Sequence, residues 1–329
     1  MTAPTRSPAA HAYVNIEAIL NQAGLTRSAH LLAGALRDAG CRVTINTRHP
    51  SLFARGVHQV WKRRRRHPYD VNIFLEHVDP HSLNLAPINL LVPNQEWLRE
   101  DTVPYLQVID GTLCKTRHAE AIFAGRSRRA VFTSFTTADR LCAGIPPDYR
   151  RFFHLAGTSL QKGTEALLTV WLRHPEWPAL TVVQHPRHQR HVRALNIAYM
   201  PEHLADGQLR TLQNRHGVHV CPSEAEGFGH SIVEAMSCCA LVITTDAPPM
   251  NELITKERGL LVPWADRVPQ RLGMAYFVDA EALEQAIATA IAMDDEEKRA
   301  IGCRARAWFD ANDLFFRRTI GAIVAGWPC

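Results

Sequence analysis

The sequence predicts an α/β protein with two Rossmann-like domains, each built on a parallel sheet. Three observations lead to this prediction. Short β-rich apolar runs alternate with helical patterns, a stretch containing Gly and Pro interrupts the alternation once, and 329 residues are too many for one ordinary core. In such sheets ligands lie at the carboxyl ends of the strands, so we expect two domains that face each other across a cleft.

In the first half of the chain, the segment 28–39 has apolar residues at helical spacing and a stop signal at Gly40. The stretch AGIPPDYR, 143–150, breaks the pattern and predicts a linker. The strands expected before it are 12–16, 42–46, 71–75, 88–92, 108–113 and 130–133.

The second half repeats the alternation. The strands expected there are 152–155, 180–184, 197–200, 218–221, 241–244 and 260–262. The expected helices are 164–173, 205–215, 231–238, 280–293 and a last one from 296 to about 326. We therefore predict an N-terminal domain over 1–147, a C-terminal domain over 148–305, and a C-terminal helix over 306–329 that packs back on the N-terminal domain.

Composition places the chain among globular proteins, because 46% of its residues are hydrophobic and only 21% are charged. No apolar run is long enough to predict a membrane span, and the first residues lack the apolar core of a secretory signal. The eight cysteines form no CxxC pair, which indicates buried free thiols in a reducing compartment. We expect a cytoplasmic protein.

The net charge of +5 includes one dense cluster, WKRRRRHP, at 61–68. Its four arginines, Arg63, Arg64, Arg65 and Arg66, form either a solvated loop or a surface for an anionic acceptor. Nucleic acid and membrane lipid fit such a surface equally well. The lipid alternative would place the protein peripherally at the inner membrane face.

The segment EGFGHSIVEAMSCCA, which begins at Glu226, combines two glycines with two carboxylates. Gly227 and Gly229 let the backbone approach a ligand closely, and the amides of a helix that begins near Ser231 would attract an anion. Glu226 and Glu234 would repel phosphate, so sugar hydroxyls are their expected partners. The alternative is structural, since Ser231-x-x-Glu234 is also the pattern of a helix capping box.

The longer segment HVCPSEAEGFGHSIVEAMSCCALVITTDAPPMNELI resembles the donor-site signature of the GT-B glycosyltransferases of family 4 (group 1). Cys239 stands where that family usually has a glycine, and Pro-Pro-Met at 248–250 replaces a glycine pair, which indicates a divergent subfamily. The matching positions are Pro222, Ser223, Glu226, Gly227, Phe228, Gly229, Glu234, Ala235, Met236 and Glu252.

This resemblance implies a retaining glycosyltransferase that takes a UDP-sugar or GDP-sugar as donor and needs no obligatory metal. It implies that Glu234 binds the ribose hydroxyls and that Glu226 lies beside the donor sugar. The backbone amides of Phe228, Gly229 and His230 would then hold sugar hydroxyls or the diphosphate. The predicted donor site is completed by Gly157, Thr158, Ser159, Lys162, Gly227, Ser231 and Met200.

A second segment, HLAGTSLQKGTEALLTVW, resembles the Arg and Lys-Gly stretch with which the family binds the diphosphate. Lys162 and Gly163 match, but the arginine is missing and Thr158 or Ser159 takes its place. Hydroxyl groups can hold a phosphate with less charge. The missing charge therefore weakens the donor site or comes from elsewhere, and a plain solvated lysine is the alternative for Lys162.

The first domain resembles the family only weakly. Gly24, Thr26 and Ser28 lie in a segment that resembles the glycine-rich loop before the first helix. His77 and Lys115 each follow an expected strand and so fall at the cleft edge. Glu226, Lys162 and His77 are the predicted catalytic residues.

Other functions and sites were also considered. The chain lacks an Asp-x-Asp motif, a P-loop and a full GxGxxG. The segment HPRHQRH at 185–191 favours a basic loop over a metal site. The acceptor could be a lipid-linked sugar, a polysaccharide or a modified nucleic-acid base. The alternatives to a transferase are a sugar-nucleotide epimerase or phosphorylase of the same fold, or an inactive nucleotide-sugar-binding module.

Overall fold

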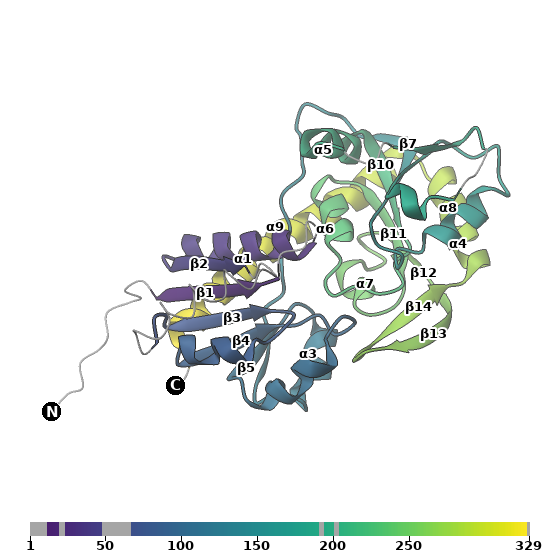
Figure 1. Cartoon of the computed structure of the whole chain (residues 1–329). Coiled ribbons are helices and arrows are strands. Elements are labelled where there is room, and N and C mark those ends of the chain that lie inside the picture. The colour runs from purple at the N-terminus through teal and green to yellow at the C-terminus, as the bar shows by residue number, and fades with distance from the viewer. Residues whose placement is uncertain (1–11, 20–23, 48–66, 191–193, 201–203, 328–329) are drawn as a thin grey trace. The chain divides into compact units, whose positions relative to one another are not determined.

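The structure is a computed structural model that describes residues 12–19, 24–47, 67–190, 194–200 and 204–327 (Figure 1). The chain forms two compact units, the first made of Met1–Thr136 with Asp313–Cys329 and the second of Thr137–Asn312. We predicted boundaries after 147 and 305. The difference at the first boundary has a clear reason, because Arg140 belongs to the second unit through side-chain hydrogen bonds to Gln213 and Asp206.

The first unit is a parallel six-stranded sheet in the order β2-β1-β3-β4-β5-β6. Strands β3 and β4 are apolar and buried along most of their length, as expected for a sheet covered on both faces. Its strands are β1 Tyr13–Ala18, β2 Arg42–Thr47, β3 Val71–Leu75, β4 Ile88–Val92, β5 Gly111–Cys114 and β6 Ala130–Phe132. Its helices are α1 Gly24–Asp38 and α3 Arg117–Ala124, with the short 3-10 helices η1 Pro80–Leu85 and η2 Glu100–Gln107.

The second unit also has a parallel six-stranded sheet, in the order β12-β11-β10-β7-β8-β9. Its strands are β7 Asp148–Gly157, β8 Leu180–Gln184, β9 Ile197–Tyr199, β10 His216–Cys221, β11 Leu241–Thr245 and β12 Leu260–Val262. Its helices are α4 Thr164–Trp171, α5 Asp206–Arg215, α6 His230–Ser237, α7 Met250–Leu253 and α8 Ala280–Ala292, with the 3-10 helix η3 Pro186–His188. This is the doubly wound order, in which the first and fourth strands of the unit lie side by side.

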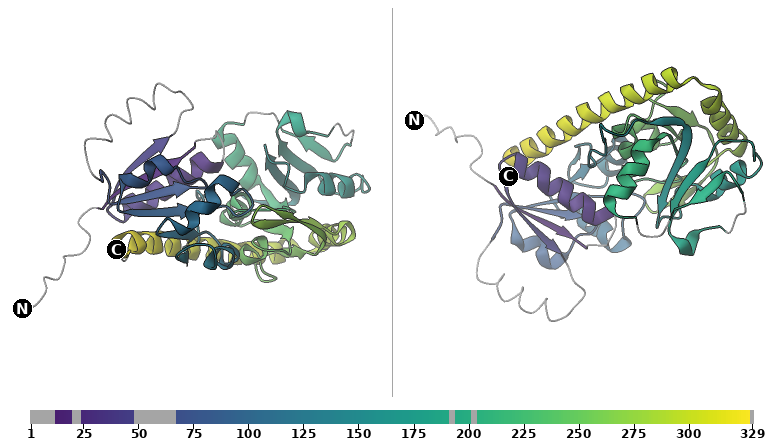
Figure 2. Two further views of the ribbon diagram at one scale, coloured as in Figure 1. Left: turned by 60° about the horizontal axis from the view of Figure 1, so that its bottom comes forward. Right: turned by 90° about the horizontal axis from the view of Figure 1, so that it is seen from above.

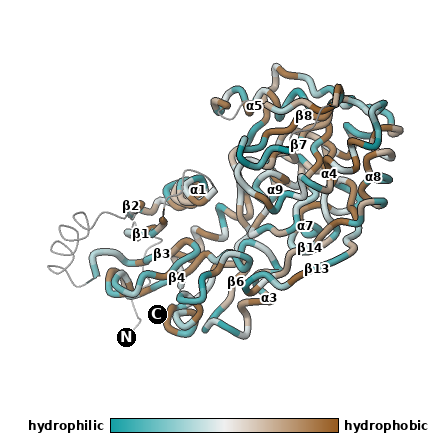
Figure 3. Tube along the Cα trace, turned by 45° about the vertical axis from the view of Figure 1, so that its right-hand side comes forward, coloured by the Kyte–Doolittle hydropathy of each residue, from teal (hydrophilic) through white to brown (hydrophobic). Residues whose placement is uncertain are grey.

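The last helix, α9 Asp295–Gly326, is one unbroken element that contributes to both units (yellow in Figure 2). Within the first unit, Arg317 donates a hydrogen bond of 2.7 Å to Asp38, and the ring of Trp327 lies against Gly111. Hydrophobic segments in Figure 3 include β3 and α8, and Leu283 and Ile287 of α8 are fully buried in the core of the second unit.

The predicted fold class is confirmed, since both sheets are parallel and each has six strands. Several details of the prediction are wrong. The expected strand 108–113 begins only at Gly111, because Val108 ends η2 in the αR conformation, and helix α3 was not predicted. The expected linker at 143–150 already contains the start of β7 at Asp148. An antiparallel hairpin, β13 Trp264–Gln270 and β14 Gly273–Val278, was also not predicted, because its first strand is exposed on both faces and so lacks a period-2 apolar pattern.

Candidate functional site

The loops after β7 and β10 carry the two segments that resemble the glycosyltransferase motifs. These strands are neighbours, but the chain leaves β7 toward β8 and leaves β10 toward β11, on opposite sides. Such a switch point opens a crevice at the carboxyl ends of the two strands, where α/β sheets bind their ligands. The amide of Glu224 donates to the carbonyl of Gln161 at 3.0 Å, so the two loops also touch there.

Lys162 and Glu226 meet across these loops. The Lys162 ammonium forms a short hydrogen bond and ion pair with Oε1 of Glu226, and it lies 3.5 Å from the hydroxyl of Ser231. Ser223 donates a second hydrogen bond of 2.7 Å to the same carboxylate oxygen. Glu226 is only 8% exposed, so its carboxylate is held in one place. The structure thus brings together the two predicted catalytic residues of this unit.

Two glycines let the loops pack this closely. Gly163 has a φ of +65°, and a Cβ there would lie 2.0 Å from the backbone oxygen of Pro222. Gly229, the N-cap of α6, has a φ of +104°, and a Cβ there would lie 2.7 Å from Leu253. Both positions therefore favour glycine for conformation, and Gly163 also requires it for space, because its close neighbour is backbone.

A buried histidine fixes the start of α4 below Lys162. The two ring nitrogens of His154 lie 2.7 Å from the Val220 carbonyl and 2.8 Å from the Thr164 hydroxyl. Burial lowers the pKa of His154 to about 4, partly offset by the bond to Val220. The ring is therefore neutral at pH 7, donating to Val220 and accepting from Thr164, and it ties β7 to β10 and to the helix that follows Lys162.

Glu234 lies inside the second unit rather than at its surface, with 1% exposure. Its two oxygens accept hydrogen bonds from the Gln213 amide at 2.7 Å and the Thr137 hydroxyl at 3.3 Å. The capping-box alternative is wrong, because α6 begins at His230 with Gly229 as N-cap and no side-chain cap. Ser231 is therefore already inside the helix rather than its N-cap.

The arginine that holds Gln213, Arg140, could not be predicted from the sequence. The guanidinium of Arg140, 5% exposed, donates 2.7 Å to the Gln213 carbonyl oxygen and 2.8 Å to Asp206. Gln213 thereby links Arg140 to Glu234 in one buried chain of hydrogen bonds. No motif marks these residues, since Arg140 lies 73 positions before Gln213 and far from the helix α5 that carries Asp206 and Gln213.

Cys239 follows the end of α6 and has a φ of +59°. The amides of Cys239 and Ala240 donate to the carbonyls of Met236 and Ala235, which is the Schellman pattern of a helix end. Glycine is the usual residue at that position. This geometry explains why a family glycine is expected there, and it makes Cys239 a strained replacement.

The β13–β14 hairpin contacts both loops of the site. The amide of Tyr276 donates to the Glu224 carbonyl at 2.8 Å. The side chains of Gln161 and Gln270 are hydrogen-bonded to each other, with Gln270 Nε2 3.0 Å from Gln161 Oε1. The hairpin therefore supports the backbone on either side of Lys162 and Glu226.

The remaining donor-site candidates of the second unit differ in their exposure and contacts. Gly157 ends β7 with a φ of +57°, followed by exposed Thr158 and by Ser159, whose hydroxyl accepts from the Gln161 amide at 3.2 Å. Met200 directly follows the edge strand β9, at the same end of the sheet. Gly227 and Phe228 are buried, and the rings of Phe228 and His230 contact each other at 5.6 Å between centroids.

In the first unit, the carboxyl ends of β3, β4 and β5 converge. The Lys115 ammonium donates 2.7 Å to Asn94 Oδ1, and the Asn94 amide donates 2.5 Å to Glu76. Lys115 is buried, which lowers its pKa, although the charge of Glu76 opposes that shift. His77 lies 2.9 Å from the Thr102 hydroxyl. Glu76 and Asn94 were missed, although both closely follow expected strands.

Three other candidates of the first unit need correction, and four lie outside the described residues. Gly24, Thr26 and Ser28 belong to α1 rather than to a loop before it, because the helix begins at Gly24 and already buries Ser28. The arginines Arg63–Arg66 lie outside the described residues.

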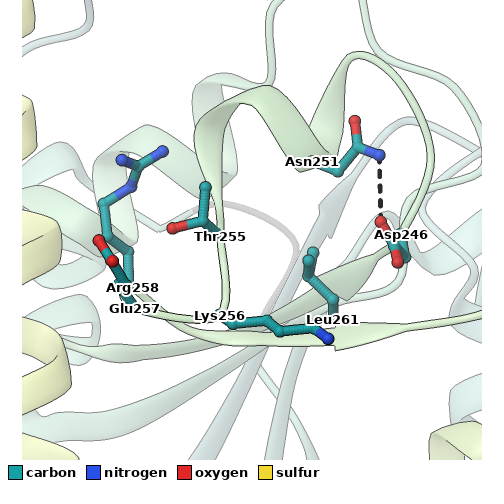
Figure 4. Close-up of a pocket in the computed structure, with 7 residues that line it drawn as sticks. All are labelled: Asp246, Asn251, Thr255, Lys256, Glu257, Arg258 and Leu261. Atoms are coloured by element: carbon teal, nitrogen blue, oxygen red, sulfur yellow. Dashed lines mark hydrogen bonds between the residues drawn. The ribbon is translucent and has the colours of Figure 1, made fainter.

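A further feature of the second unit is an open depression of about 460 Å³ beyond β11 (Figure 4). Seven residues between Asp246 and Leu261 line it, and Asn251 donates to Asp246 at 3.0 Å. None of the predicted donor-site residues belongs to this lining.

Comparisons with known proteins agree with the fold and with the motif. Residues 190–308 match the family model for glycosyl transferases group 1. This confirms the resemblance for the segment that contains Glu226 and Glu234. No curated protein matches the chain.

Solved structures match nearly the whole chain at low sequence identity. Sucrose-phosphate synthase from Thermosynechococcus elongatus matches with a TM-score of 0.72 and 18% identity over 94% of this chain and 96% of that one. Anabaena HepE in complex with UDP and glucose matches with a TM-score of 0.69 and 13% identity, over 96% and 100%. The glycosyltransferase WaaG, involved in lipopolysaccharide biosynthesis, matches with a TM-score of 0.65 and 15% identity, over 95% of this chain and 100% of that one. The chain therefore has the GT-B fold.

No helix within the described ranges is both long and apolar enough to cross a membrane.

Proposed function

We propose that this chain is a glycosyltransferase that moves a sugar from a nucleotide-sugar donor to an acceptor. The observation that carries the proposal is the Lys162–Glu226 pair, held by loops from β7 and β10 at the switch point of a doubly wound sheet. Ligands of such sheets bind there. The match of residues 190–308 to group 1 glycosyl transferases supports the same function.

In this proposal Lys162 stabilises the negative charge that develops on the leaving diphosphate, together with the amides at the start of α6. Glu226 lies beside the donor sugar, where its carboxylate accepts hydroxyl hydrogen bonds and orients Lys162. Glu234 accepts the ribose hydroxyls of the nucleotide. HepE, a structural relative, binds UDP and UDP-glucose, so we propose a UDP-sugar as the first donor to test and a GDP-sugar as the second.

The finer features of the reaction are also proposed. The transfer retains the configuration of the sugar and needs no metal ion. The acceptor binds the first unit, where His77 and Lys115 follow β3 and β5. A lipid-linked sugar, a polysaccharide and a modified nucleic-acid base are the acceptor classes, and Arg63–Arg66 would bind an anionic one. The protein acts in the cytoplasm.

A thermal-shift screen of UDP- and GDP-sugars against the full chain tests the donor. A donor that binds raises the melting temperature, because it stabilises only the folded state. Transfer to a panel of the three acceptor classes, followed by product NMR, then reports the anomeric configuration. Conversion of the donor without an acceptor would favour the epimerase alternative, and binding without any conversion would favour the inactive module.

Lys162→Met and Lys256→Met are matched variants for this screen. Both remove one ammonium from the second unit, but Lys256 is exposed and lines the separate depression. We expect Lys162→Met alone to abolish the donor-induced shift. Equal shifts in both variants would refute the proposed role of Lys162.

A further inference from the structure

The loop between β7 and α4 is short of positive charge for a diphosphate. Its lysine, Lys162, is already paired with the carboxylate of Glu226, so the pair is neutral overall. Thr158 and Ser159 offer hydroxyl groups but no charge. Each phosphate of a nucleotide sugar carries a negative charge, and a site without a compensating cation binds it weakly.

A neighbouring strand brings a basic segment to this loop. Strand β8 pairs with β7, with Gln184 opposite Gly157. The next residue, His185, donates its amide to the Gly157 carbonyl at 2.8 Å. The segment that begins there, HPRHQR, therefore starts beside the first residue of the loop and places Arg187 two residues further on, in η3.

The two arginines of this segment differ in their partners. Arg190 forms an ion pair with Glu165 at 3.8 Å and a hydrogen bond of 3.2 Å with Thr169, both on α4. Arg187 is exposed, and within the described part of the chain no carboxylate pairs with its guanidinium. Arg187 is therefore the arginine of this segment whose donors can turn to a ligand.

We propose that Arg187 supplies the positive charge for the donor diphosphate that the loop after β7 lacks. The inference rests on the proposed function, since it concerns the donor of the same site. A guanidinium presents paired N–H donors that match phosphate oxygens, which a lysine cannot reproduce in full. The charge thus comes from the neighbouring strand end instead of from the loop itself.

Calorimetry with the full chain tests the proposal. UDP and GDP are the probes, and whichever binds more tightly is then compared with the corresponding nucleoside monophosphate. A hydrogen bond to a charged group contributes about 1.5–3 kcal/mol. We therefore expect Arg187→Gln to weaken the binding of the nucleoside diphosphate by about 10-fold or more. The affinity for the nucleoside monophosphate should fall much less. Arg187→Lys should recover part of the loss, and Arg190→Gln should change the affinity by less than about 2-fold.

Each other outcome is decisive. Unchanged diphosphate binding in Arg187→Gln overturns the role of Arg187 and leaves the proposed function standing. Equal losses in Arg187→Gln and Arg190→Gln, or a loss only in Arg271→Gln of the nearby hairpin, overturn it as well. If the wild-type chain binds no nucleotide or nucleotide sugar, the proposed function itself fails.

Discussion

Replacing Glu234 tests the ribose role, but the substitution must respect its burial. Alanine would leave a void and an unpaired Gln213 amide inside the second unit, because Glu234 is 1% exposed and accepts from that amide at 2.7 Å. Such a change costs about 3 kcal/mol or more. Loss of nucleotide binding in Glu234→Ala would therefore not separate a ligand role from a structural one.

Glutamine at this position preserves the internal contacts. Its amide oxygen can accept from Gln213, and its amide nitrogen can donate to the Thr137 hydroxyl, because a hydroxyl can also accept. The charge is lost, and one acceptor oxygen becomes a donor nitrogen. We expect Glu234→Gln to lower the free energy of unfolding by about 1 kcal/mol, which corresponds to about 2–4 °C in melting temperature.

Nucleotide binding should respond more strongly than stability. A carboxylate that accepts ribose hydroxyls makes charge-assisted bonds, and the neutral amide loses about 1–2 kcal/mol of that interaction, or about 10-fold in affinity. The assay is calorimetry with UDP and 2′-deoxy-UDP. Wild-type protein should prefer the ribose form, and Glu234→Gln should lose most of that preference.

The matched control is Glu257→Gln, which removes an exposed carboxylate of the same unit and should change neither affinity. A folded Glu234→Gln protein that binds UDP with unchanged affinity and preference would refute the reasoning. Glu234 would then have a structural role, which includes holding Gln213 and Thr137.

Three further predictions concern stability, each measured by urea unfolding. Cys239→Gly should stabilise the protein by about 1 kcal/mol, because Cys239 has a φ of +59°, whereas Cys239→Ala should bring no such gain. Gly163→Ala should destabilise by about 3 kcal/mol or more, since its Cβ would lie 2.0 Å from the Pro222 oxygen; Gly144→Ala, with open space around it, should be nearly neutral. The pKa of His154 is about 4 when folded and 6.5 ordinarily, so the unfolded chain binds the proton first and stability falls by up to about 3 kcal/mol as pH drops from 6.5 to 4. His154→Gln should show a smaller drop, and an equal drop in both proteins would exclude His154 as a source.

The sequence by itself determined the sheets, because buried parallel strands need continuous apolar runs. Strands β3, β4 and β8, which are buried along most of their length, have the predicted bounds for this reason. The hairpin 264–278 was missed because its first strand is exposed and is defined by pairing with β14 rather than by an apolar pattern. A local apolar pattern indicates that a strand is buried, and β13 is exposed along most of its length.

The motif also marked Lys162, Glu226 and Glu234, since the spacing of chemically distinctive residues can be recognised without a structure. What surrounds them could not be predicted. The pairing of Lys162 with Glu226 joins positions 64 apart in sequence, and the link from Gln213 to Arg140 spans 73. Only the order of the strands in the sheet decides which loops meet.

Local sequence therefore determined the fold class and marked the residues that we propose to bind a nucleotide sugar. The tertiary structure decided how those residues are used: Glu234 is buried against Gln213, Lys162 is neutralised by Glu226, and the end of β8 lies beside Gly157. The physical reason is that an apolar pattern is formed by a few consecutive residues and can therefore be recognised in the sequence. Hydrogen bonds and ion pairs of a site join segments that become neighbours only when the sheet has formed.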